Sequence, residues 1–163
     1  MIIVAPAKSS HAEAIAALAD EMDQFYGVTE AEKRELRIRQ INEAIFADQP
    51  SAYALLAWEE DQLAGFAAYS FLWPAVGLSR SLFLKELYVA EAARHTGVGT
   101  QLMQALFEIA LKQRCSRVEW QTEVANEAAR AFYAGLGTPE FTGKVLYRVE
   151  GEGLLQAANQ TRL

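Results

Sequence analysis

Apolar positions recur along this chain with two spacings, and the spacing separates helices from strands. Apolar side chains three or four residues apart predict helices over residues 12–22, 29–46, 98–112 and 126–136. Short apolar or alternating runs predict strands over residues 1–4, 52–58, 63–72, 81–89, 117–123 and 145–150, with about one helical turn in the tail. Three consecutive strands joined by short turns, followed by two crossover helices, predict a mixed sheet in an α/β fold.

Local signals set the ends of the helices. Ser9 and Ser10 are predicted to cap the first helix. Thr29, with Glu32 three residues later, has the spacing of a capping box for the second helix. Asn126 is predicted to cap the last long helix. Because no repeat or linker interrupts this order, residues 1–163 are predicted to form a single domain.

Composition is typical of a soluble globular protein, with 52% hydrophobic and 22% charged residues. No apolar run is long enough to span a bilayer, and the first residues lack the pattern of a signal peptide. The single cysteine, Cys115, cannot form an internal disulfide, which fits a reducing compartment. We therefore expect a cytoplasmic protein without a membrane partner, in which Cys115 is a small buried residue rather than a catalytic thiol.

The net charge of −6 is concentrated in the N-terminal third. Residues 1–60 carry eleven acidic and five basic side chains, whereas residues 61–163 carry ten of each. An acidic region repels nucleic acid and attracts cationic partners, so no nucleic-acid partner is expected. The alternative is that these carboxylates lie on solvated helix faces.

The chemistry-bearing part of the chain is the junction between strand 81–89 and helix 98–112. Arg94 begins a turn that carries Gly97 and Gly99. The first amides of a helix lack internal partners, and a glycine without Cβ lets an anion approach the backbone. The turn is therefore a candidate pyrophosphate site. The alternative is a tight turn in which the glycines serve only packing.

A second motif follows about thirty residues later, over residues 126–137, with Phe132-Tyr133 in its middle and Leu136-Gly137 at its end. Together the two motifs resemble those of the Gcn5-related N-acetyltransferases, and the order of elements is similar to that family's over nearly the whole chain. The resemblance implies the family's fold, a mixed central sheet flanked by helices. It also implies acetyl-coenzyme A (acetyl-CoA) as cosubstrate, and no metal.

The resemblance assigns the binding of acetyl-CoA to two stretches of backbone and one side chain. The pantetheine arm is expected beside strand 81–89, and the pyrophosphate on the turn and first helical residues. The residues so assigned are Leu87, Tyr88, Val89, Arg94, His95, Thr96, Gly97, Val98, Gly99, Thr100 and Asn126. The imidazoles of His95 and His11 are expected to be incidental.

Asn126 and Tyr133 are seven residues apart, so they share one face of a helix. The resemblance implies that Asn126 hydrogen bonds the cosubstrate and that Tyr133 protonates the departing thiolate. A phenol with a pKa of about 10 suits a proton donor better than a base at neutral pH. The alternative is that Tyr133 only packs beside Phe132.

The candidate general base is Glu86. Strand alternation places Glu86 and Tyr88 on one face and Lys85 and Leu87 on the other. Glu86 is the only carboxylate just ahead of the expected bulge in this strand, so it is the candidate for deprotonating an amine. The alternatives are Glu123 or a water molecule held by backbone carbonyls.

Within the superfamily, residues 65–69, 114–116 and 126–133 resemble the diamine (spermidine/spermine) N-acetyltransferase group. Lys85 stands where that group has a glutamate, and Ala125 where it has an aromatic residue. These differences favour a primary amine of a small molecule, such as a diamine or amino acid, over a long polycation. A homodimer is expected because relatives often dimerise. The alternatives are a non-catalytic acyl-CoA sensor and a protein or peptide N-acetyltransferase.

Overall fold

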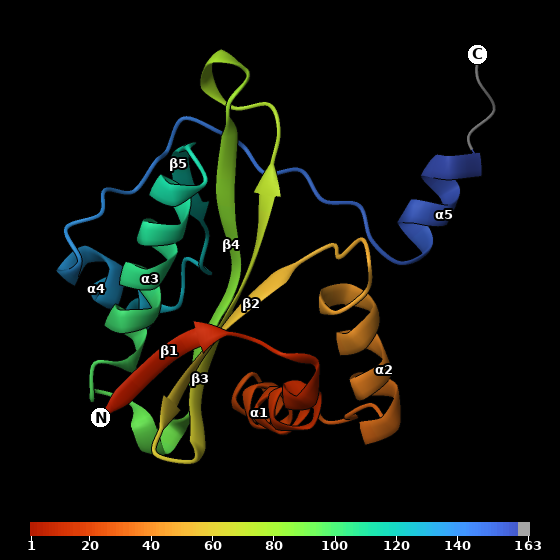
Figure 1. The fold of residues 1–163 in the computed structure, drawn as a ribbon. Helices are drawn as coiled ribbons and strands as arrows, with labels where there is room; N and C mark the ends of the chain where they lie inside the picture. The colour runs from red at the N-terminus through yellow and green to blue at the C-terminus, as the bar shows by residue number, and fades with distance from the viewer. Residues whose placement is uncertain (160–163) are drawn as a thin grey trace. The chain divides into compact units, whose positions relative to one another are not determined.

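The computed structural model describes residues 1–159, which fall into two units, Met1–Glu123 and a second that begins at Val124. Each unit is described by itself. The first contains one five-stranded sheet with the strand order β1-β2-β3-β4-β5 (Figure 1). Its strands are β1 (Ile2–Pro6), β2 (Tyr53–Glu59), β3 (Gln62–Leu72), β4 (Arg80–Val89) and β5 (Cys115–Trp120).

The sheet is mixed, as the sequence predicts. Strands β1 to β4 are antiparallel neighbours, whereas β5 runs parallel to β4. A parallel neighbour requires a crossover connection, and α3 (Val98–Lys112) provides it. The α/β class and the predicted span of α3 are therefore confirmed.

The remaining helices of this unit precede β2 or lie in turns. Helices α1 (Ala12–Phe25) and α2 (Arg34–Ile45) lie between β1 and β2. Three short 3-10 helices are η1 (Ser9–His11), η2 (Val76–Leu78) and η3 (Glu91–Ala93). No helix among residues 1–159 is both long and apolar enough to cross a membrane.

Alternation along β3 assigns the two faces of the sheet. Phe66 belongs to a buried cluster with Ile15 and Leu18 of α1 and Tyr88 of β4. Its neighbour Gly65 points to the opposite face, where α3 packs. A Cβ on Gly65 would lie 3.0 Å from Val98 and 2.9 Å from the Tyr88 carbonyl oxygen. The absence of a side chain at Gly65 therefore lets the first turn of α3 rest directly on the sheet.

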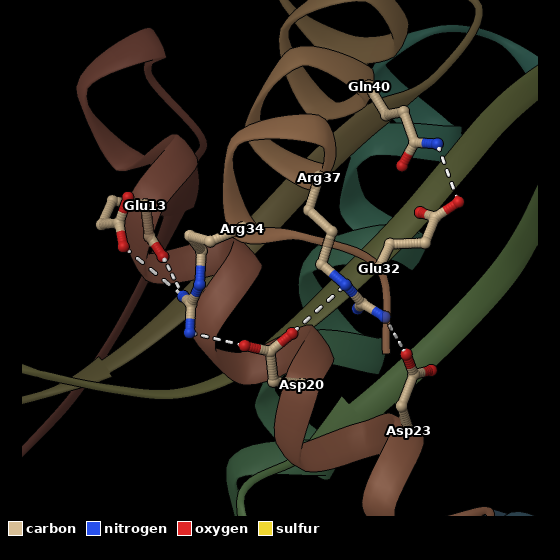
Figure 2. A network of polar contacts seen from close by, with 7 residues as sticks. All are labelled: Glu13, Asp20, Asp23, Glu32, Arg34, Arg37 and Gln40. Carbon is tan, nitrogen blue, oxygen red and sulfur yellow. Dashed lines mark hydrogen bonds and ion pairs between the residues drawn. The ribbon is translucent and has the colours of Figure 1, made fainter. Parts of the chain in front are cut away.

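Helices α1 and α2 are joined by a network of ion pairs (Figure 2). Arg34 of α2 pairs with Asp20 at 2.5 Å and with Glu13 at 3.5 Å. Arg37 lies 3.2 Å from Asp20 and also pairs with Asp23. The Asp23 hydrogen bond is the main reason that the pKa of Arg37 is raised. Because the Arg37 side chain is mostly buried, this network fixes α2 against α1.

The ion pairs between α1 and α2 engage some of the acidic side chains of the N-terminal third. Asp20 and Asp23 pair with arginines of the same unit, and Glu32 accepts a hydrogen bond from Gln40 at 3.4 Å. These carboxylates are neutralised or engaged within the unit rather than presented to a cationic partner. The excess of acidic side chains in residues 1–60 therefore gives less support for a positively charged partner than the sequence alone does.

Two predicted helix caps are wrong. Ser9 and Ser10 form η1 instead of capping α1, whose N-cap is His11 without a side-chain cap bond. The second helix begins at Arg34 rather than after Thr29. Its first-turn Arg34 pairs with Asp20 of α1, a long-range interaction that local cap signals do not contain.

The second unit contains α4 (Glu127–Gly135) and α5 (Glu152–Asn159). Asn126 caps α4 as predicted, since its Oδ1 accepts the Ala129 N–H at 3.1 Å. Gly137 follows the helix with φ of 73°, the left-handed conformation that favours glycine. The strand predicted over residues 145–150 is wrong for this structure, because that segment has no strand partner among the described residues.

Candidate active site

Strand β4 changes its pairing half-way along, and this defines the candidate site. It pairs with β3 along almost its whole length, but with β5 only from Arg80 to Leu84. The edge that faces β5 is therefore without a strand partner over Leu87–Val89 among the described residues. Unpaired backbone N–H and C=O groups in that stretch can hydrogen bond an extended ligand.

A bulge at Lys85 orients the next side chain. Tyr69 of β3 lies opposite Leu84, whereas Ala68 lies opposite Glu86, so Lys85 is the extra residue. Ala68 packs against the cluster under α1, and cross-strand partners share a face. Glu86 therefore lies on the α1 face with Tyr88, as the alternation predicts. The bulge precedes Glu86, whereas the sequence analysis expected it to follow.

The carboxyl group of Glu86 is more basic than that of an ordinary glutamate. Its side chain is half-buried, and burial raises the pKa of its carboxyl group. The Leu87 N–H and the positive charge of Lys85 act in the opposite direction with smaller effect. A carboxylate with a raised pKa holds a proton more readily, which is what proton abstraction from an amine requires.

The end of α1 lies close to Glu86, a feature that sequence reasoning missed. Burial raises the pKa of Tyr26, and the charge of Glu86 raises it further, whereas Arg94 lowers it. Tyr26 is thus within electrostatic range of both groups. The sequence analysis ended the first helix at residue 22 and assigned no role to Phe25 or Tyr26. Phe25 lies four positions after the half-buried Glu21, and this helical spacing is the signal that could have placed them on one face.

Glu21 ties α1 to the end of β4. Its Oε1 accepts the Tyr88 hydroxyl at 3.1 Å and the Glu91 backbone N–H at 2.7 Å. Burial, followed by this hydrogen bond from its hydroxyl to Glu21, raises the pKa of Tyr88. Tyr88 is therefore held as a neutral donor, and its side chain positions the strand end rather than titrating.

Arg94 closes the same cluster from the turn. Its guanidinium donates to the Tyr88 hydroxyl at 3.3 Å and to the Val89 carbonyl at 3.3 Å. The guanidinium carbon also lies 4.3 Å from the centre of the Phe25 ring, a cation–π contact. The side chain thus braces α1, β4 and the turn together, a role that the motif alone did not indicate.

The turn itself has the backbone of an anion site. His95 has φ of 63° and Gly97 φ of 96°, so two left-handed residues lead into α3. The first helical bond runs from the Gln101 N–H to the Gly97 carbonyl at 3.0 Å, which leaves the amides of residues 98–100 without helical acceptors. Thr96 Oγ1 donates to the Ala93 carbonyl at 2.7 Å and stiffens the turn.

The other sequence candidates lie elsewhere. Asn126 and Tyr133 lie on α4, two helical turns apart, as predicted. His11 is structural, because its Nδ1 accepts the Lys8 N–H at 3.1 Å and its ring lies 5.3 Å from that of Trp58. Burial raises the pKa of the Cys115 thiol, which disfavours a thiolate nucleophile.

The sequence matches the acetyltransferase (GNAT) family over residues 15–138, a stretch that contains the β4 junction, the turn and α4. The chain therefore belongs to this family and is an acetyltransferase of the GNAT type. Members of the family use acetyl-CoA as the acetyl donor, which agrees with the candidate pyrophosphate site in the turn before α3.

Individual relatives agree with the predicted subgroup. The chain is 25% identical to thialysine N-epsilon-acetyltransferase of Mus musculus over 86% of this chain and 91% of that protein. It is 31% identical to the uncharacterized N-acetyltransferase YhfO of Bacillus subtilis (strain 168) over 86% and 92%. A Homo sapiens spermidine/spermine N(1)-acetyltransferase-like protein is 28% identical over 69% of this chain, which spans 18% of that protein's length.

A solved structure confirms the fold. An integron cassette protein from the mobile metagenome of V. cholerae is 29% identical to this chain, with a TM-score of 0.90 over 98% of both chains. The predicted fold and the predicted position near the diamine acetyltransferase group are both confirmed by these relatives.

We predict that Gly97→Val weakens the binding of coenzyme A. The φ of 96° strains any other residue at this position, and a side chain there extends into open space, where phosphates would approach. We expect the dissociation constant, measured by titration calorimetry, to rise at least about tenfold, which corresponds to about 1.4 kcal/mol.

Gly77→Val is the matched control, because Gly77 has φ of 61°, is equally open and lies in η2. It carries a comparable backbone strain, so thermal unfolding should show a comparable loss of stability while coenzyme A affinity stays unchanged. Wild-type affinity in the Gly97 variant would contradict the anion-site assignment.

Proposed function

We propose that this protein transfers the acetyl group of acetyl-CoA to the primary amine of a small molecule, with Glu86 as the general base. One observation carries the proposal: a half-buried carboxylate with a raised pKa lies at the bulge of β4, directly before the unpaired stretch of that strand. A base, a backbone edge for the donor and an anion-binding turn thus follow one another within residues 86–100.

The cosubstrate is proposed to bind through its pyrophosphate and its pantetheine arm. The pyrophosphate accepts hydrogen bonds from the amides of residues 95–100, and the pantetheine lies along the free edge of residues 87–89. Asn126 contributes its Nδ2, because its Oδ1 already accepts the Ala129 N–H. Arg94 adds positive charge while its guanidinium stays engaged with Tyr88, Val89 and Phe25.

The reaction is proposed to proceed by direct attack. The amine nitrogen forms a bond to the thioester carbonyl carbon, and the carbon–sulfur bond breaks. Glu86 accepts the proton that the amine nitrogen loses, directly or through water. The Tyr133 hydroxyl donates a proton to the departing thiolate. Support for Tyr133 is its place in the second motif, seven residues after Asn126 on the same face of α4.

The acceptor is proposed to be a short amine or an amino acid with its own carboxylate. Lys85 is exposed beside Glu86, so it repels a second ammonium group but attracts a carboxylate. The aromatic residues Phe25 and Tyr26 at the end of α1 offer an apolar wall near Glu86 for the carbon chain. The relatives named as thialysine and L-ornithine acetyltransferases act on amino acids of this kind by name.

We further propose that both units act as one acetyltransferase domain in the cytoplasm. The motif pair supports the first point, since one motif lies in each unit and the family match includes both. The single cysteine supports the second. Nucleic acid is not proposed as a partner, because the chain carries a net charge of −6.

An acceptor screen tests the proposed function. We expect thiol release from acetyl-CoA, followed colorimetrically, with short diamines and lysine-like amino acids, and poor turnover with spermine. Preference for spermine over every amino acid would contradict the Lys85 argument. Coenzyme A binding without turnover of any amine would favour a sensor, and turnover only with peptides would favour a protein acetyltransferase.

We predict that Glu86→Gln removes the acidic limb of the pH profile of kcat/KM. The base must be unprotonated, so activity rises as pH increases through the raised pKa of Glu86. That limb should lie above the ordinary glutamate value of about 4.3. The variant should lose about a hundredfold or more in kcat/KM.

Glu123→Gln is the matched comparison, because Glu123 is the alternative base and is exposed. We expect it to retain the limb and nearly full activity. A normal profile in the Glu86 variant together with a lost limb in the Glu123 variant would reverse the assignment.

We predict that Tyr133→Phe lowers kcat by roughly a hundredfold, at the low end of general acid catalysis, because coenzyme A thiolate is already a fair leaving group. The ring is retained, so coenzyme A affinity and thermal stability should change little. Turnover should be measured under single-turnover conditions, where chemistry limits the rate. An unchanged rate there would leave Tyr133 as a packing residue.

A further inference from the structure

Arg94 stands in the donor motif, but its guanidinium contacts β4 and α1. Its Nε donates to the Val89 carbonyl oxygen and its Nη2 to the Tyr88 hydroxyl, both at 3.3 Å. The guanidinium carbon lies 4.3 Å from the centre of the Phe25 ring and 5.7 Å from the centre of the Tyr88 ring. These partners of the guanidinium therefore lie outside the turn that is proposed to hold the pyrophosphate.

The end of α1 depends on Arg94 more than the rest of that helix does. The last α1 residue in the ion-pair network with α2 is Asp23. Phe25 follows two residues later and is 56% exposed, so burial holds its ring only weakly. The ring lies edge-on to the Tyr88 ring, with 6.2 Å between ring centres, and carries the Arg94 guanidinium on its face. Arg94 is thus the charged anchor for the last turn of α1.

Glu21 fixes the position of this anchor. Its Oε1 accepts a hydrogen bond from the Tyr88 hydroxyl at 3.1 Å, and the oxygen of that hydroxyl accepts one from Arg94. Because the hydroxyl proton is directed to Glu21, the lone pairs of the oxygen are available to the guanidinium. The same Oε1 accepts the Glu91 N–H at 2.7 Å, in the short helix η3 before the turn. A chain of hydrogen bonds therefore sets the guanidinium against Phe25.

Tyr26 connects the anchored ring to the chemistry. Its ring is in edge contact with the Phe25 ring, with 5.2 Å between ring centres. The charge of Glu86 raises the pKa of Tyr26, and the charge of Arg94 lowers it. The Tyr26 hydroxyl is thus within electrostatic range of both the proposed base and the arginine. A shift of Phe25 would therefore also shift Tyr26 and the apolar wall near Glu86.

We infer that Arg94 is a positioning residue for the acceptor amine. Its guanidinium holds Phe25 and Tyr26 where the carbon chain of the amine packs, whereas the donor depends on the backbone amides of the turn. This inference rests on the proposed function, because it requires an acceptor bound beside Glu86. It gives an arginine of the donor motif a role in the other half of the reaction.

Arg94→Lys separates the position of the guanidinium from its charge. Lysine keeps a positive charge near the turn, but its ammonium lacks the planar fork that reaches a carbonyl, a hydroxyl and a ring face together. We expect KM to rise at least about fivefold for the amine that the acceptor screen finds to be turned over best. The dissociation constant of coenzyme A, measured by calorimetry, should stay within about twofold of wild type.

Arg39→Lys is the matched control, because it makes the same substitution at an exposed arginine of α2. Neither constant should change in this variant. A rise in the dissociation constant of coenzyme A with an unchanged acceptor KM in Arg94→Lys would place Arg94 in the donor site alone and overturn the inference. An equal rise in both constants would also overturn it, since it would indicate a general loss of structure.

A double-mutant cycle with Phe25→Leu tests whether Arg94 acts through the ring. Leucine keeps an apolar side chain at the wall but offers no aromatic face to the guanidinium. In the Phe25→Leu background, Arg94→Lys should raise the acceptor KM by less than about twofold, because the contact is already lost. The same rise in both backgrounds would show that the two residues act independently, against the inference.

Amide hydrogen exchange gives a readout that needs no turnover. The N–H groups of residues 26–28 donate to carbonyls near the end of α1. We expect these amides to exchange several-fold faster in both Arg94→Lys and Phe25→Leu, while the amides of residues 102–106 in α3 keep their protection. Unchanged exchange at residues 26–28 in both variants would overturn the inference.

The two arms also separate this inference from the proposed function. A wild type that turned over no amine would contradict the proposed function and this inference together. Turnover by wild type, with an unchanged acceptor KM in Arg94→Lys, would overturn this inference alone.

Discussion

The structure depends on the fact that β4 is paired along nearly its whole length on one side and only along its first half on the other. Strand β4 pairs with β3 almost throughout, whereas its pairing with β5 ends at Leu84. The unpaired backbone beyond that point is costly unless something hydrogen bonds to it, and a ligand with an extended polar chain can do so. The bulge at Lys85 lies at the same point, and it turns Glu86 toward α1. The unpaired edge proposed for the acetyl donor and the position of the proposed base Glu86 thus both follow from the change of pairing at Leu84–Lys85.

Rigidity around that irregularity comes from a small polar cluster. Glu21 accepts hydrogen bonds from Tyr88 and from the backbone of η3, and Arg94 donates to Tyr88 while covering Phe25. Each member contacts at least two elements, so α1, β4 and the turn before α3 are held as a unit. Such support is what keeps reacting groups in fixed geometry. Ion pairs between α1 and α2 hold α1 to a further element (Figure 2).

The sequence by itself determined the elements and the motif positions. The span of α3, the cap of α4 by Asn126 and the shared face of Glu86 and Tyr88 follow from periodicity and short-range hydrogen bonding, and such signals are local. Only tertiary structure decided where α2 begins, where the bulge lies, and that Tyr26 lies within electrostatic range of Glu86. It also decided that Glu21, Tyr88 and Arg94 interact with one another at the end of β4. Those outcomes depend on contacts between segments up to about seventy residues apart, such as Glu21 with Glu91. The 145–150 segment shows the same limit, because alternation predicts a strand but a strand forms only when another backbone is available to pair with it.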